Sequence, residues 1–154
     1  AISSDEIRFE ILTKEHIPQL IAIEHEAYPD PWTQGMFHQE LKNGPSHFYL
    51  AFRGDDLLAY GGFWLLLDEI HITKLTVVRP FRRRGLGSLV MDFLEEFGQS
   101  IGAKTSRLEV RESNEAARVL YASAGYTEIG IRKRYYAASG EDAVVMAKEL
   151  VVPG

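Results

Sequence analysis

A cluster of arginines and glycines lies near the middle of the sequence. Residues 79–88 read Arg-Pro-Phe-Arg-Arg-Arg-Gly-Leu-Gly-Ser. They follow a stretch rich in β-branched residues at 71–78 and precede apolar residues that recur at helical spacing up to Ile101. A helix that begins near Gly85 would point unpaired backbone N–H groups, and the positive end of its dipole, at this loop. We therefore expect a strand, loop and helix whose loop binds an anion such as phosphate.

Two well-known phosphate motifs do not fit this loop. A P-loop would place a lysine between its second glycine and the hydroxyl residue, but Gly87 is followed directly by Ser88. A dinucleotide fingerprint needs a third glycine at position 90, where Val90 stands. The alternative without a ligand is an exposed basic turn on a surface helix. In a chain of net charge −5, however, so dense a basic cluster indicates a local role.

The loop resembles the acetyl-coenzyme A loop of the GNAT family of N-acetyltransferases. In that family the pattern Arg/Gln-x-x-Gly-x-Gly/Ala follows a strand with Leu-x-Val and precedes a long amphipathic helix, and residues 82–87 with 75–77 upstream match it. The resemblance implies acetyl-coenzyme A as the co-substrate. It also implies that the loop holds the pyrophosphate of the coenzyme, and the loop residues are Arg82, Arg83, Arg84, Gly85, Leu86, Gly87 and Ser88. The pantetheine and acetyl group would lie along the backbone of Leu75 and Val77 in the preceding strand.

The composition predicts one globular domain over residues 1–154. No apolar run approaches the roughly 20 residues of a membrane span, and no signal peptide is visible, so we expect a soluble, cytoplasmic protein without membrane contact. The lack of cysteine excludes disulfides, thiolate metal sites and a cysteine nucleophile. The net charge of −5 argues against a protein that coats nucleic acid.

A metal centre and a serine hydrolase are not expected either. The pair His25-Glu26 could begin a zinc protease motif, but the second histidine is replaced by Pro29. No serine stands in a Gly-x-Ser-x-Gly motif. The sequence therefore predicts no metal and no serine triad.

Hydrophobic periodicity and turn residues predict the remaining elements. Helices are expected after Thr13, after Thr33, from about Gly85 to Ile101 and after Ser113 or Asn114, and strands over 7–11, 47–52, 57–67, 71–78, 106–111, 126–134 and 143–150. Residues 135–142 would join the last two strands, and Gly61-Gly62 indicates a bulge or a close backbone approach. The order β-α-α-β-β-β-α-β-α-β-β predicts an α+β fold, with a mixed sheet between helices on both faces and a right-handed crossover joining parallel strands.

This order matches the GNAT family from end to end, and three motifs resemble the subfamily that acetylates protein amino termini. They are Asp30-Pro31-Trp32-Thr33, Leu108-Glu109-Val110-Arg111 with Ser113-Asn114, and Arg134-Tyr135-Tyr136 with Gly140-Glu141-Asp142-Ala143. The likeness is strongest to bacterial enzymes that acetylate the amino-terminal alanine of a ribosomal protein. It implies a protein or peptide substrate with a free amino terminus and leaves the oligomeric state open.

Acetyl transfer to an amine needs a neutral nucleophile, donors to the developing oxyanion and a proton source for the thiolate. A protein α-amine titrates at about 7.7–8.0, so modest general-base help is enough at neutral pH. From strand alternation alone, Glu109 could be a solvated glutamate or the general base. The resemblance to the family implies that it is the base. Glu24 and Glu69 are the other candidates for the base. The resemblance also implies Tyr121 as the acid, although the pattern alone would make it a core tyrosine. We expect the N–H of Val77 to hold the oxyanion.

The other site residues follow from the same resemblance. Asn114 matches a position that touches the coenzyme arm, and its plainer role is a helix cap. Tyr135 and Tyr136 are adjacent aromatics that would be unusual in a core, and they are assigned to peptide binding. Trp32, with Tyr28, would form the opposite wall, unless it only packs the second helix onto the sheet.

Two other functions stay open at this point. The same fold could acetylate a lysine side chain or a small amine, which a loop carrying Tyr135 and Tyr136 over an extended peptide disfavours. A non-catalytic module could bind acyl-coenzyme A and lack turnover, which the retention of both Glu109 and Tyr121 argues against.

Overall fold

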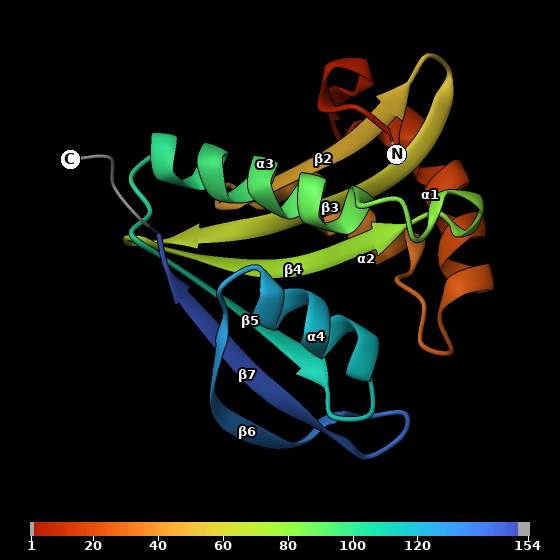
Figure 1. Cartoon of the computed structure of the whole chain (residues 1–154). Coiled ribbons are helices and arrows are strands. Elements are labelled where there is room, and N and C mark those ends of the chain that lie inside the picture. Colours follow the sequence, from red (N-terminus) through yellow and green to blue (C-terminus); the bar gives the residue numbers. More distant parts are fainter. Residues whose placement is uncertain (1, 151–154) are drawn as a thin grey trace.

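The computed structural model describes residues 2–150, and these form one mixed sheet with helices packed on it (Figure 1). The strands lie in the order β1-β2-β3-β4-β5-β7-β6. The elements are β1 (Arg8–Ile11), α1 (Ile17–Ala27), α2 (Gln34–Lys42), β2 (Ser46–Arg53), β3 (Asp56–Leu66), β4 (Glu69–Val77), α3 (Leu86–Ser100), β5 (Thr105–Arg111), α4 (Glu115–Ser123), β6 (Thr127–Tyr136) and β7 (Glu141–Glu149). Within this part of the chain, no helix is long and apolar enough to cross a bilayer.

The helices cover both faces of the sheet, as predicted. On one face, Val90, Met91 and Leu94 of α3 are buried in the larger core cluster. On the other face, Leu20 of α1 and Phe37 of α2 are buried in a second cluster with residues of β2 and β3. The periodic apolar stripes that predicted these helices are therefore the surfaces that hold them on the sheet.

The parallel pair β4 and β5 marks the centre of the sheet. It is joined through α3, which confirms the predicted crossover between parallel strands. Its ladder runs only from Glu69↔Thr105 to Ile72↔Leu108, and beyond this point the two strands separate. Figure 1 shows the ends of β4 and β5 pointing apart, so the sheet is open between them on the side where the loop and α4 lie.

A bulge in β4 accompanies this separation. Gly62 pairs with Lys74 and Phe63 pairs with Ile72, which leaves Thr73 as an extra residue in β4. The strands are also very close here, because a Cβ on Gly61 would lie 2.7 Å from the carbonyl oxygen of Lys74. Both features confirm the bulge or close approach predicted at the glycine pair, and a bulge of this kind bends and twists its strand.

The last hairpin differs from its prediction. The expected connection over 135–142 is wrong, because β6 continues through Tyr136, β7 begins at Glu141 and only residues 137–140 join them. The strand is irregular here, with a register shift between Arg132 and Tyr136 and a left-handed φ of 51° at Arg134. Because of this irregularity, the alternation of side chains stops before the strand does, so the pattern does not predict where the strand ends.

Candidate active site

The loop before α3 has the backbone geometry of an anion site. Gly85 is the N-cap of α3 with a left-handed φ of 78°, and no side chain caps the helix at this position. The Leu89 N–H donates to the Gly85 oxygen at 3.1 Å and so closes the first turn of the helix. The N–H groups of residues 86–88 consequently point out of the helix end, where an anion is favoured.

Arginines surround this helix end. Arg82, Arg83 and Arg84 are all exposed, and the Nε of Arg82 donates to the Val77 oxygen at 3.1 Å. A cavity of about 340 Å³ lies beside the loop, and we call it the loop cavity; it is lined by Val77, Arg82, Arg83, Gly85, Leu86, Gly87, Ser88, Ala116, Ala117 and Leu120. Bare backbone, free N–H groups and positive charge thus fit a pyrophosphate with an attached arm.

The end of β4 carries unpaired backbone groups into the opening of the sheet. The Val78 N–H donates to the Leu58 oxygen of β3 at 2.9 Å. Because bonded and non-bonded pairs alternate along an antiparallel ladder, the N–H groups of Leu75 and Val77 face away from β3. They lie beyond the last β4–β5 pair, so they point into the gap between the two strands.

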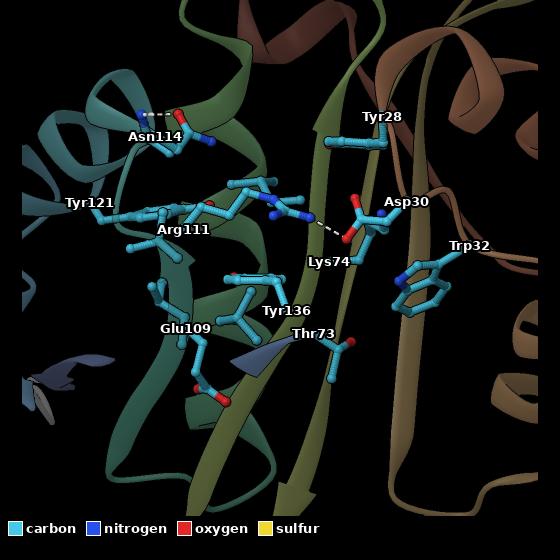
Figure 2. Close-up of a pocket in the computed structure, with 15 residues that line it drawn as sticks. Tyr28, Asp30, Trp32, Thr73, Lys74, Glu109, Arg111, Asn114, Tyr121 and Tyr136 are labelled. Atoms are coloured by element: carbon cyan, nitrogen blue, oxygen red, sulfur yellow. Dashed lines mark hydrogen bonds and ion pairs between the residues drawn. The ribbon is translucent and has the colours of Figure 1, made fainter. Parts of the chain in front are cut away.

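A pocket of about 190 Å³ occupies the gap between β4 and β5, and we call it the central pocket (Figure 2). It shares Ala117 with the loop cavity. It also shares six residues with a third cavity, of about 460 Å³, which reaches α2 and which we call the acceptor cavity; these are Asp30, Trp32, Ile72, Thr73, Glu109 and Tyr136. The three cavities follow one another from the loop, through the opening of the sheet, to the face covered by α2, and we call this series of cavities the passage.

Glu109 lies where the central pocket and the acceptor cavity meet. Its side chain is 4% exposed, and both carboxylate oxygens lie 2.9 Å from the Nε2 of His71. Burial would raise the pKa of Glu109, but the His71 hydrogen bond and the charges of His71, Arg107 and Arg132 together bring this pKa below its usual value. Glu109 is therefore an ionised carboxylate facing the passage.

The two rival carboxylates lie elsewhere. Glu24 is fully buried and bound by the Tyr60 hydroxyl at 2.6 Å, the Trp32 N–H at 2.9 Å and the Lys74 Nζ at 2.9 Å. Glu69 begins β4 and accepts a hydrogen bond from the Thr105 hydroxyl at 3.2 Å. Neither lines the passage, and the bonds of Glu24 make it a structural group.

Tyr121 and Asn114 reach the central pocket from α4 and its cap (Figure 2). Burial raises the pKa of Tyr121, so its phenol keeps its proton and can act as a donor. The Oδ1 of Asn114 accepts the Ala117 N–H at 3.1 Å, which makes Asn114 the N-cap of α4. Because it also lines the pocket, the cap and the predicted contact to a coenzyme arm are compatible.

Aromatic side chains form the walls of the passage. Tyr28 donates or accepts a hydrogen bond with Thr76 at 2.7 Å, and Lys74 lies 4.2 Å from its ring centroid and 5.0 Å from that of Trp32. Trp32 also packs against Phe37 of α2 with ring centroids 5.1 Å apart, so it both holds this helix and lines two of the cavities. The opposite wall comes from β6, where Tyr135 and Tyr136 stand perpendicular to each other.

Several residues that line the passage were not assigned to the site from the sequence, among them Asp30, His71, Lys74 and Arg111. Arg111 extends across the central pocket and forms an ion pair with Asp30, and its guanidinium lies 4.0 Å from the Tyr136 ring centroid (Figure 2). Strand alternation places Arg111 on the same face of β5 as Glu109, which is a usable signal in the sequence. The partners of Lys74 and His71 depend on the register of β4, which the sequence does not reveal.

Comparisons with known proteins agree with this geometry. Residues 17–126 match the acetyltransferase (GNAT) family. The ribosomal protein bS18-alanine N-acetyltransferase of Salmonella typhimurium is 36% identical, over 89% of this chain and 93% of that protein. The N-alpha-acetyltransferase RimI of Mycobacterium tuberculosis is 33% identical, over 78% of this chain and 77% of that protein.

A solved structure supports the same assignment. The crystal structure of the ribosomal-protein-S18-alanine N-acetyltransferase from Escherichia coli superposes with a TM-score of 0.85 at 29% identity, over 96% of both chains. Sequence, fold and passage therefore agree, and the chain belongs to the acetyltransferase (GNAT) family.

Proposed function

We propose that the protein transfers the acetyl group of acetyl-coenzyme A to the free α-amino group of a protein, with an S18-type ribosomal protein that begins with alanine as the substrate. The observation that carries this proposal is the passage through the sheet, which opens to the loop at one end and to an aromatic-walled cavity at the other. A donor and an acceptor can enter from opposite faces and meet beside Glu109. Such a substrate would place the enzyme with the ribosomes in the cytoplasm.

The donor half of the passage would hold acetyl-coenzyme A, which supplies a thioester as the activated acetyl group. The N–H groups of residues 86–88, with Arg82, Arg83 and Arg84 at the rim, suit its pyrophosphate. The free backbone groups of Leu75 and the side chain of Asn114 suit its arm. The N–H of Val77 would donate to the oxygen that becomes negative during transfer.

Two side chains would move protons in this ternary complex. Glu109 would take one proton from the acceptor amine as the carbon–nitrogen bond forms. Tyr121 would give its phenolic proton to the departing sulfur as the carbon–sulfur bond breaks. A covalent intermediate on the protein is not required, in keeping with a chain that contains no cysteine.

The basicity of a carboxylate favours an α-amine over a lysine as the acceptor. A carboxylate such as Glu109 is a weak base, so it suits an amine that is already partly neutral. An α-amine titrates at about 7.7–8.0 and is neutral in a sizeable minority at pH 7, whereas a lysine, at about 10.4, is almost wholly protonated. The names of the relatives above point to the same α-amino chemistry.

Coenzyme release against a peptide panel tests the proposal. The panel holds peptides that begin with Ala, Ser or Met-Glu, and an acetyl-blocked Ala peptide that contains lysine. We expect release with the free Ala peptide and none with the blocked one. Equal modification of the blocked peptide would identify a lysine enzyme, and binding of acetyl-coenzyme A without release for any peptide or small amine would identify a non-catalytic module.

A further inference from the structure

His71 is fixed against Glu109 by the centre of the sheet. His71 pairs with Arg107 in the parallel ladder, one step before its last pair, so its side chain and that of Glu109 project from neighbouring strands. The Nε2 of His71 lies 2.9 Å from both oxygens of Glu109, and the two side chains are 16% and 4% exposed. The contact is therefore short, symmetric and shielded from water.

A base in this position needs a partner of this kind. Burial favours the protonated form of a carboxyl group, and a protonated carboxyl cannot take a proton from an amine. The groups that face Glu109 are His71 from β4, Arg107 from its own strand, and Arg132 and Tyr135 from β6. Arg132 is 3.3 Å away and 53% exposed on an edge strand, so His71 is the closer and better shielded donor.

We propose that His71 is a positioning residue for acetyl transfer: its Nε2–H holds the Glu109 carboxylate in the orientation that faces the passage. The inference rests on the function proposed above. In the reaction, the proton passes from the amine nitrogen to a Glu109 oxygen, and no bond to His71 is made or broken. Loss of His71 therefore lowers the rate through Glu109 alone.

Two substitutions at His71 separate hydrogen bonding from packing. His71→Leu removes the donor at similar volume, whereas His71→Gln keeps an N–H donor. We expect His71→Leu to lower kcat for an Ala peptide about tenfold, a fraction of what a general base contributes, with the KM for acetyl-coenzyme A unchanged. His71→Gln should recover most of this loss. The matched control is His47→Leu, because His47 is a partly buried histidine on β2 that lies outside the passage. This variant should keep the kcat of the wild type.

The same substitution in a Glu109→Gln background decides whether His71 acts through Glu109. We expect no further fall in kcat there, because the group that His71 serves is gone. A direct readout is the ¹³C NMR titration of the Glu109 carboxyl, assigned by its absence in Glu109→Gln; its midpoint should move to higher pH in His71→Leu.

Each remaining outcome has a distinct meaning. An equal fall of kcat in both backgrounds, or an unchanged NMR midpoint, would overturn the role of His71 and leave the function of the protein intact. Full turnover of Glu109→Gln itself would remove both the proposed base and the inference that depends on it, while acetyl transfer to the Ala peptide could still stand.

Discussion

The ion pair between Glu24 and Lys74 offers a quantitative test of how the wall of the passage is built. Glu24 is 0% exposed and Lys74 is 10% exposed, with the Nζ 2.9 Å from a Glu24 oxygen. Removal of one partner leaves the other charge buried, which costs about 3–5 kcal/mol. We therefore expect Lys74→Met to lower the free energy of unfolding by this amount and the Tm by about 6–20 °C for a chain of this size.

Removal of both charges should cost much less. In the double variant Glu24→Gln/Lys74→Met, a neutral amide can still accept the Tyr60 hydroxyl, and no charge is left without a partner. Replacement of a buried ion pair by uncharged groups is often close to neutral. The double variant should therefore be at least about 2 kcal/mol more stable than Lys74→Met alone.

Urea unfolding followed by far-ultraviolet circular dichroism measures the stability of the wild type, the two single variants Glu24→Gln and Lys74→Met, and the double variant. This signal is preferable to tryptophan fluorescence, because Trp32 lies beside Lys74 and would report the local change. Strictly additive losses, or a double variant no more stable than Lys74→Met, would refute the view that these two charges depend on each other.

Three further predictions concern the donor half and the proposed acid and base. Tyr121→Phe should lower kcat at least tenfold, which is within the range of general-acid effects. The Kd of acetyl-coenzyme A, measured by calorimetry, should stay unchanged, because only the phenolic donor is lost. A matching loss of affinity would mean that Tyr121 only packs against its neighbours. Gly87→Val should raise the Kd of acetyl-coenzyme A at least tenfold by filling the loop cavity, since even a Cβ at position 87 would lie 3.1 Å from the Leu120 side chain. The control Gly44→Val, whose Cβ would have no atom within 4 Å, should bind acetyl-coenzyme A normally. Because the pKa of Glu109 is lowered in the folded state, the wild type should be more stable than Glu109→Gln above about pH 4.3. This difference in the free energy of unfolding should vanish as the pH falls through the folded-state pKa of Glu109. Urea titrations in which the difference grows in acid would contradict the prediction.

The elements with regular patterns could be predicted from the sequence. The apolar stripe of α3 and the β-branched run before it fix a strand, loop and helix locally, and Gly85 supplies the left-handed N-cap between them. The last hairpin could not be predicted in the same way. Its strand passes through a left-handed Arg134 and a register shift, so Tyr135 and Tyr136 lie in β6 although alternation has already ended.

Within the candidate site, too, the parts formed by residues close in the sequence could be predicted, and the contacts between distant residues could not. The loop cavity is lined largely by residues between 77 and 88, which are close in the sequence and could be named in advance. Its remaining lining residues come from α4 and were not predicted; they are Ala116, Ala117 and Leu120. The pair Asp30–Arg111 joins residues 81 positions apart, and the contact of His71 with Glu109 spans 38 positions. Such contacts depend on strand order and on the extra residue Thr73 in β4, which a single sequence does not specify.

The early end of the β4–β5 ladder has a consequence for how such enzymes can diversify. Main-chain amides present the same donors whatever side chains they carry, so in the proposed function an apolar exchange at position 75 or 77 that keeps the core packing would leave the donor half intact. The acceptor half, by contrast, is made of side chains such as Trp32 and Tyr136, and mutation there would alter the preferred partner directly. In the proposed function, a change of substrate preference would therefore come from the acceptor side chains, while the main-chain donors to the coenzyme stay the same.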